Sequence, residues 1–320
     1  MRYQLMVIKK NPTDVTHMSD NSISRLVELF TKNYLSPCTK LAYSKDIEQF
    51  LMFCKEQGHS FRHPKEITSD HFRAYRDWLM NERQLQSNSV LRKMVSMRAL
   101  MTWCFHEGLI DRNPLLNVQL PKGKQISSTS AFTDEEVRII LALPKKDTLS
   151  GALHYAVLVM LFYLGLRKSE LINIRIKDFS DERNHLTLTL HGKGDKYRKV
   201  PITPFIKTVV EEYKTKCSKS FTQDSFLFQP IRNNFSKTTE KQLHTSTINY
   251  FIWFYTSKAE IDKNVSPHSC RATIITHLLD NKIPIRDIAN FVGHSSIQTT
   301  SIYDKNKNDL DKSPAYKVQY

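Results

Sequence analysis

The sequence predicts a mainly α-helical protein with one small antiparallel β-sheet, divided into two domains. Three observations support this prediction. Apolar residues recur at helical spacing along most of the chain, the alternation typical of strands is confined to residues 185–202, and the helical pattern is interrupted between residues 117 and 132. A chain of 320 residues is long enough for two domains that each bury an apolar core.

Residues 1–20 lack sustained periodicity, which predicts a poorly ordered lead-in. Residues 21–117 are predicted to form the first domain, a bundle of four helices that each turn an apolar face inward. Gly58 and Gly108 follow two of these helical patterns and can end them. Each helix is expected to begin at or just after a residue that can cap it: Ser22, Ser36, Thr68 and Ser87.

Residues 118–131 are polar and rich in turn-forming residues, which predicts a linker between the domains. A surface loop within one domain is the alternative, and the complete helical patterns on both sides make it less favoured. The second domain is predicted to cover residues 132–320. It opens with Thr133-Asp-Glu-Glu136, a capping box that starts a helix.

The second domain contains a helix that is expected to be fully buried and a β-hairpin. Residues 152–164 are nearly all apolar, and Gly165 ends this helix. Residues 185–190 alternate as a half-buried strand, and residues 197–202 return as its partner. The turn between them places Lys193 at the tip of the hairpin, where it can reach a substrate or simply be solvated. The turn lacks the pattern of a nucleotide-binding P-loop.

The charge balance favours a polyanionic partner. The chain has 47 Lys and Arg residues against 32 Asp and Glu, a net charge of +15. Basic side chains spread over the first domain can lie along DNA phosphates, although any single one is more often part of a solvated surface. A basic protein without such a partner remains the alternative on charge alone.

No cofactor, metal ion or membrane is expected. The five cysteines form no Cys-x-x-Cys pair, which suggests neither a disulfide framework nor a zinc site. His277 lies in an apolar helical stretch and is predicted to be a core histidine instead of a ligand. No apolar run approaches the roughly 20 residues that span a bilayer, and the N-terminus does not resemble a signal peptide, so a cytoplasmic protein is expected.

A group of polar motifs near the C-terminus indicates an anion-binding site. Pro267 can start a helix, which places His268 and Arg271 on one face, three positions apart. A second short helix ends at the Gly293-His294 pair, and Tyr303 follows nine residues after this histidine. Two imidazoles, a guanidinium and a phenol would thus project from successive helix edges toward one anion.

The order of these motifs resembles the C-terminal signature of the tyrosine recombinase, or phage-type integrase, family, which includes the Xer-like site-specific recombinases. The sequence from Leu166-Arg167 to Glu170 looks like the first arginine motif of that family, and Gly192-Lys193-Gly194 looks like its lysine-bearing hairpin. The resemblance covers about residues 22–310. It implies an N-terminal core-binding (SAM-like) domain and a C-terminal α+β catalytic domain.

The resemblance also implies that DNA is cleaved through a covalent 3′-phosphotyrosine, without a metal ion. Tyr303 would be the nucleophile, and Arg167 and Arg271 would stabilise the charge on the scissile phosphate. The implied catalytic residues are Arg167, Lys193, His268, Arg271, His294 and Tyr303.

The resemblance also implies which residues transfer protons and which residue orients the catalytic arginine. Lys193 matches the general acid for the leaving 5′-hydroxyl, while His268 would act as the base for the tyrosine or donate a hydrogen bond to the phosphate. His294 would donate a hydrogen bond to a nonbridging oxygen. Glu170 would orient the arginine site without contacting the DNA itself.

The implied activity is site-specific recombination of double-stranded DNA by a homotetramer, through a Holliday junction. Whether the protein is a monomer without DNA, and whether accessory proteins take part, stay open. Two alternatives are a type IB topoisomerase, which shares the chemistry, and a DNA-binding protein without catalysis. Chromosome-dimer resolution, integration and inversion also stay open as biological roles.

Overall fold

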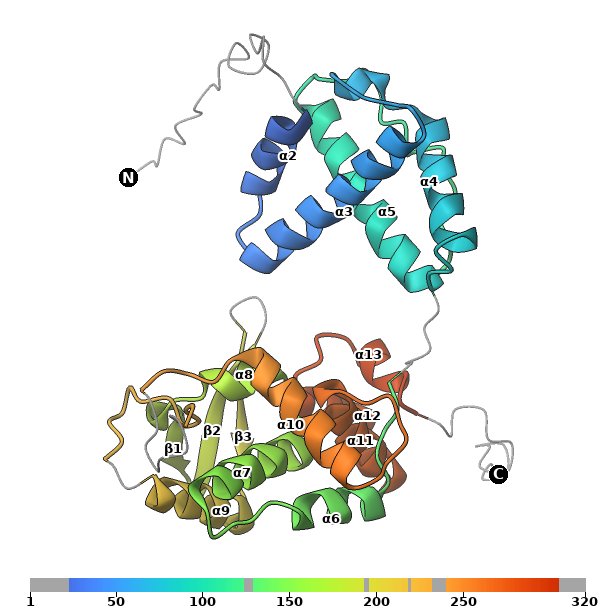
Figure 1. Ribbon diagram of the computed structural model, residues 1–320. Helices are drawn as coiled ribbons and strands as arrows, with labels where there is room; N and C mark the ends of the chain where they lie inside the picture. The colour runs from blue at the N-terminus through green and yellow to red at the C-terminus, as the bar shows by residue number, and fades with distance from the viewer. Residues whose placement is uncertain (1–22, 124–128, 193–195, 218–219, 232–239, 305–320) are drawn as a thin grey trace, which may run out of the picture. The chain divides into compact units, whose positions relative to one another are not determined.

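The computed structural model describes residues 23–123, 129–192, 196–217, 220–231 and 240–304. The chain divides into two compact units, Met1–Gln125 and Ile126–Tyr320. In the part of the chain that is described, both units are mostly helical and the strands belong to the second unit (Figure 1). The predicted fold class, helices with one small antiparallel sheet, is therefore confirmed.

The first unit is the predicted four-helix bundle. The two longest helices cross at its centre (Figure 1), and the stacked rings of Phe50 and Phe72, with centroids 4.8 Å apart, lie in the core. Val118 is buried in the same core, so the first unit includes the chain that follows its last helix. The helices are α2 (Ile23–Lys32), α3 (Pro37–Glu56), α4 (Ser69–Asn81) and α5 (Ser87–His106), with a short 3-10 helix η1 (Pro64–Glu66).

A buried carboxylate joins the two crossing helices of the first unit. Asp46 on α3 is 2% exposed and accepts hydrogen bonds from Arg92 (Nη2–Oδ1 2.8 Å), Lys93 (3.1 Å) and Ser96 (2.9 Å) on α5. A buried charge needs such partners, because an unpaired one is costly to remove from water. The cluster thereby fixes the charged groups of Arg92 and Lys93 against α3.

The second unit contains a three-stranded sheet and eight described α-helices. Its strands are β1 (Phe179–Glu182), β2 (His185–His191) and β3 (Tyr197–Pro201), preceded by the 3-10 helix η2 (Ile176–Asp178). Its helices are α6 (Asp134–Ala142), α7 (Leu149–Leu164), α8 (Lys168–Asn173), α9 (Pro204–Lys216), α10 (Thr245–Lys258), α11 (Pro267–Asp280), α12 (Ile285–Val292) and α13 (Ile297–Ser301).

Helix α7 is the central element of the second unit, as its apolar sequence predicts. It packs against α6, α9, α10 and α11, and nearly all of its side chains are buried. Gly165 ends it in the left-handed conformation (φ 57°), which a residue without Cβ adopts readily. The next residues, Leu166 and Arg167, are thereby directed from the core toward the start of α8.

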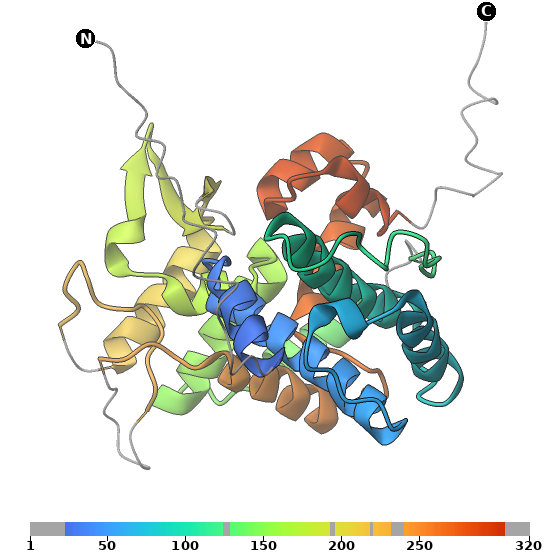
Figure 2. The ribbon, with the colours of Figure 1, turned by 90° about the horizontal axis from the view of Figure 1, so that it is seen from above.

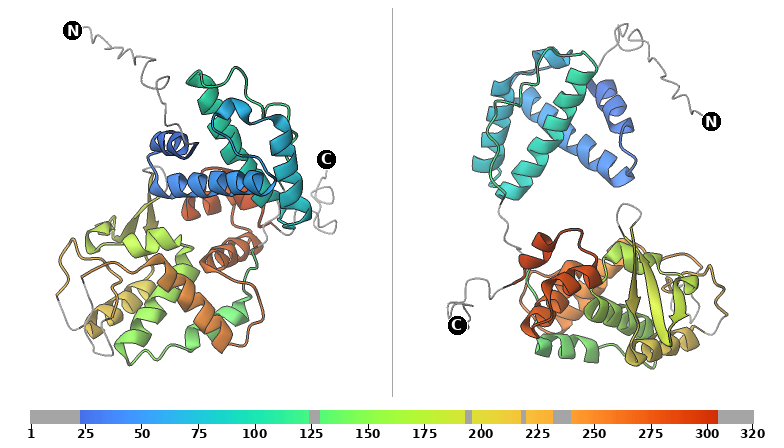
Figure 3. Two further views of the ribbon diagram at one scale, coloured as in Figure 1. Left: turned by 45° about the horizontal axis from the view of Figure 1, so that its top comes forward. Right: turned by 180° about the vertical axis from the view of Figure 1, so that it is seen from behind.

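The sheet is antiparallel with the order β1-β2-β3, and α9 lies near one end of its strands (Figure 3). The predicted hairpin corresponds to β2 and β3, with Leu190 opposite Arg198. Strand β1 was not expected from the sequence. It joins β2 through Arg183 and Asn184, both at positive φ. The predicted turn at Lys193 lies outside the described residues.

None of the helices in the described residues is both long enough and apolar enough to cross a bilayer.

Candidate active site

The C-terminal end of α12 gathers three arginines. The last carbonyl groups of a helix have no partner within it and carry the negative end of the helix dipole, so they attract cations. Helices α12 and α13 lie together here (Figure 2). The three hydrogen bonds run from Arg198 Nε to Phe291 O (3.1 Å), from Arg271 Nη2 to Val292 O and from Arg167 Nη2 to Gly293 O (2.8 Å).

Glu170 is hydrogen-bonded to two of these arginines, Arg167 and Arg198. Its carboxylate is 4% exposed and accepts hydrogen bonds from Arg167 (Nη1–Oε1 2.6 Å) and from both terminal nitrogens of Arg198 (2.8 and 2.9 Å). Burial alone raises the pKa of Glu170, but the hydrogen bonds and charge of Arg198, followed by those of Arg167, lower its pKa overall. Glu170 is therefore an anion that holds two guanidinium groups in place.

Arg271 is the most deeply placed of the three cations. Its side chain leaves α11, is 1% exposed and donates from Nη1 to the carbonyl of Gly165 (2.6 Å). Burial, then the charge of Arg167, lowers the pKa of Arg271 to about 9, so it stays protonated at neutral pH. Arg167 is nearer to solvent, with its side chain 35% exposed.

His294 follows the left-handed cap Gly293 and lies over Arg271. Its Nε2 accepts from the Nε of Arg271 (3.4 Å), and its Nδ1 lies 2.8 Å from the hydroxyl of Thr300. A ring that accepts at Nε2 carries its proton on Nδ1 and donates it to Thr300. Burial, then the charges of Arg271 and Arg167, lowers the pKa of His294 to about 4. This imidazole is therefore neutral at physiological pH.

The phenol of Tyr303, just after α13, lies 3.0 Å from Nε2 of His268 at the start of α11. Ser266 caps this helix through the amide of His268 (3.3 Å), with Pro267 in its first turn. Desolvation, then the charges of Arg271 and Arg167, lowers the pKa of His268. The neutral imidazole at this position can accept the phenol proton.

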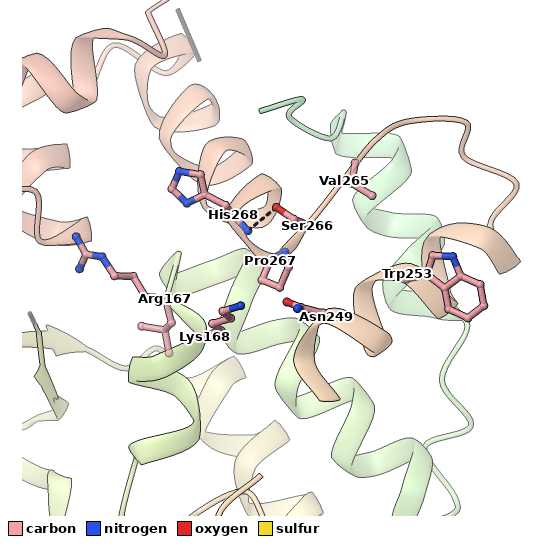
Figure 4. A pocket seen from close by; sticks show the side chains of 9 residues that line it. Arg167, Lys168, Asn249, Trp253, Val265, Ser266, Pro267 and His268 are labelled. Carbon is pink, nitrogen blue, oxygen red and sulfur yellow. Dashed lines mark hydrogen bonds between the residues drawn. The ribbon is translucent and has the colours of Figure 1, made fainter. Parts of the chain in front are cut away.

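A pocket of about 510 Å³ opens beside Arg167 and His268. Figure 4 shows both side chains at one side of it, while the indole of Trp253 lies at the other. Amino, amide and hydroxyl groups line the wall between them. The lining residues are Leu166, Arg167, Lys168, Asn249, Trp253, Val265, Ser266, Pro267 and His268.

The structure brings together every predicted site residue that it describes, through contacts that join α8, α11, α12 and α13. Lys193 lies outside the described residues. The prediction for His277 was wrong: this side chain is exposed and lies 3.2 Å from Asp134, because only the first part of α11 is enclosed by other elements. Sequence reasoning missed Arg198, although it belongs to the Gly-Lys-Gly-x-Lys-x-Arg stretch of the hairpin.

Comparison with known proteins identifies the family of both units. The model of the phage integrase family matches residues 130–309, and that of the phage integrase N-terminal SAM-like domain matches residues 23–110. A tyrosine recombinase of Pseudothermotoga lettingae is 31% identical over 270 residues, which cover 84% of this chain and 87% of that protein. The tyrosine recombinase XerC of Anoxybacillus flavithermus is 28% identical over 279 residues, covering 85% and 88%.

The fold also matches a solved structure, a lambda integrase tetramer bound to a Holliday junction. The TM-score is 0.65 at 15% identity, with 91% of this chain and 83% of that chain covered. Both units of the chain thus match models of one family. The chain belongs to the phage integrase family, the tyrosine recombinases.

Proposed function

We propose that the protein is a site-specific DNA recombinase that cleaves and rejoins strands with Tyr303 as the nucleophile. The observation that carries this proposal is the position of the phenol oxygen, 3.0 Å from Nε2 of His268. One chain thus supplies the nucleophile, the base and the arginine cluster. A nucleophile, a base within hydrogen-bonding reach and a fixed positive charge are what metal-free phosphoryl transfer needs.

The arginines supply the electrostatic part of the reaction. Arg167, with its side chain 35% exposed, is placed to contact a nonbridging oxygen of the scissile phosphate. Arg271 is 1% exposed, so its charge acts from beneath the phosphate. Arg167 is held by Glu170 and a carbonyl oxygen, and Arg271 by two carbonyl oxygens, so little reorganisation is needed as negative charge builds up.

The proton steps assign His268 as the base. Its neutral imidazole takes the phenol proton while the Tyr303 oxygen forms a bond to phosphorus and the bond from phosphorus to the 5′-oxygen breaks. Lys193 gives a proton to the leaving 5′-oxygen, so the products are a 3′-phosphotyrosine and a 5′-hydroxyl. Attack by a 5′-hydroxyl from another duplex reverses these steps and joins the new strand.

The pocket beside the arginines suits the DNA backbone next to the cleavage site. Lys168, Asn249 and Ser266 offer donors for phosphate oxygens, next to Arg167 and His268. The net charge of +15 supports a duplex partner. A homotetramer is proposed because the fold resembles that of lambda integrase, whose tetramer binds a Holliday junction.

A trapping experiment tests this function. The DNA that flanks the gene, prepared as overlapping duplexes with a nick near each possible cleavage position, is incubated with the protein and separated under denaturing conditions. The protein should form an adduct with a DNA 3′-end, and Tyr303→Phe should bind the same duplex in a gel shift without forming one. Tyr163→Phe, an exposed tyrosine on α7, is the matched control and should keep the adduct.

Three results contradict the proposal. An adduct of equal yield with Tyr303→Phe would show that another residue is the nucleophile. Duplex binding without any adduct would instead identify a DNA-binding protein without catalysis.

A type IB topoisomerase would relax supercoiled plasmid without producing recombinant molecules. The match to the SAM-like domain ahead of the catalytic unit favours the recombinase.

A further inference from the structure

We propose that Arg198 is a positioning residue for strand cleavage, which holds Glu170 and the end of α12 so that Arg167 meets the phosphate correctly. This inference rests on the proposed function of the same site. Arg198 is the second residue of β3 and lies 28 positions from Glu170 in the sequence. It therefore links the sheet to the arginine cluster.

The hydrogen bonds of Arg198 use every nitrogen of its guanidinium. The Nε donates to the carbonyl of Phe291 (3.1 Å), while Nη1 and Nη2 form a paired contact with the two oxygens of Glu170 (2.8 and 2.9 Å). The side chain is 12% exposed, compared with 35% for that of Arg167. Arg198 is therefore built into the protein, and Arg167 is the one that faces a ligand.

The contacts of Glu170 explain how Arg198 acts through it. One oxygen, Oε1, accepts from both Arg198 (2.8 Å) and Arg167 (2.6 Å), and the other accepts from Arg198 and the Arg167 amide (2.9 Å). Without Arg198, the carboxylate would keep only Arg167 as a cationic partner. It would then compete with the DNA phosphate for that guanidinium, which is the group that must bind the phosphate.

The backbone around Gly293 is shaped to fit Arg198. A Cβ on this glycine would lie 2.7 Å from Nη1 of Arg198, so the chain passes directly over the guanidinium. Gly293 also precedes His294, so this packing sets where the imidazole stands. Lysine cannot replace Arg198, because its single ammonium lacks the planar fork that reaches Glu170 and Phe291 together.

The experiment compares Arg198→Gln, Arg198→Lys and the control Lys199→Gln. Lys199 is the next residue of β3, is exposed and pairs with Glu182, so its substitution removes the same charge from the same strand. Cleavage of the nicked duplex is followed in a single turnover, and the dissociation constant is measured by titration. For Arg198→Gln we expect a cleavage rate lower by about 100-fold with a dissociation constant changed by less than about 3-fold.

Two further readouts separate positioning from a structural role. Arg198→Gln should deepen the loss of rate at acidic pH beyond the loss that protonation of His268 causes, because the pKa of Glu170 rises when it loses its main cationic partner. The double variant Arg198→Gln, Glu170→Gln should be no slower than the slower single variant, since both substitutions interrupt one path. Arg198→Lys should fold and still lose most of the rate.

The inference is overturned if Arg198→Lys or Arg198→Gln cleaves within about 3-fold of the rate of the unchanged protein. It is also overturned if the rate losses of the two single variants multiply in the double variant while the pH profile of Arg198→Gln stays unchanged. If the unchanged protein forms no adduct, the proposed function fails, and the coupling of Arg198 to Glu170 is then measured from the unfolding of the two single variants and the double variant. Independent effects on unfolding would also overturn the inference.

Discussion

The hydroxyl oxygen of Tyr303 lies 3.0 Å from Nε2 of His268, although the two residues are 35 positions apart. The ring centroids of His268 and His294 lie 6.4 and 6.5 Å from that of the phenol. The phenol thus has two imidazoles as neighbours, and His268 is hydrogen-bonded to its oxygen. This geometry distinguishes the roles of the two histidines.

His268→Gln should slow cleavage by about 100-fold or more, since the phenol loses its base. The pKa of His268 is lowered from its ordinary value of 6.5, so the ring is neutral at that pH. With His268 present, the rate should therefore fall only at a pH below 6.5, where the ring becomes protonated. The rate of the variant should lack this acidic limb. Single-turnover rates between pH 5 and 8 measure both effects. His277→Gln on the same helix is the control, and an acidic limb retained by His268→Gln would contradict the assignment.

Gly293→Ala should be more destabilising than Gly108→Ala. Both glycines end a helix at similar positive φ, 67° and 71°, so each substitution has the same backbone cost of about 1–2 kcal/mol. At Gly108 nothing lies within 4 Å of the added Cβ, whereas at Gly293 it meets Arg198 at 2.7 Å. We expect a further loss of about 1–3 kcal/mol in the free energy of unfolding. Equal losses in denaturant titrations would show that Arg198 moves aside freely.

The free energy of unfolding should decrease as the pH falls from 6.5 toward 4. The folded pKa of His294 is lowered to about 4, so between these values the unfolded chain binds the extra proton and the folded state loses stability. His154, whose pKa burial lowers to about 4, acts in the same direction. His294→Gln should reduce the slope by at most about 1.4 kcal/mol per pH unit. Unfolding curves with the same slope for both proteins would contradict this.

Asp46→Asn should destabilise the first unit by about 2–3 kcal/mol, because the buried cluster with Arg92 and Lys93 loses its anion. The control is Asp70→Asn, whose side chain is 85% exposed and pairs with Arg73 at the surface. It should change stability by less than about 1 kcal/mol. Chemical denaturation of the full chain measures both variants, and a similar small change in both would show that the cluster is not stabilising.

Features set by neighbouring residues could be predicted from the sequence. Thr133 and Glu136 form the expected capping box, with bonds of 2.7 and 3.2 Å, and Gly165 and Gly293 end their helices in the left-handed conformation. These contacts lie within one turn of the chain, where residue type alone decides them.

Strand β1 and Arg198 could not be predicted in the same way. The turn before β2 uses Arg183 and Asn184 at positive φ in place of the usual glycine, so the sequence carries no strong turn signal there. Arg198 lies between the exposed Tyr197 and Lys199, so strand alternation turns it inward with Val200, but residue types do not show which groups its guanidinium meets there. Its partners belong to other parts of the chain.

The sequence by itself determined the two helical units, the helix ends and the family to which the chain belongs, since these follow from local periodicity, capping and motif order. Only the tertiary structure decided that three arginines from α8, β3 and α11 meet at the end of one helix. The physical reason is that their partners there are backbone carbonyl groups, which every residue has. Such partners leave no trace in the residue types and are found only when packing brings the helix end to the guanidinium groups.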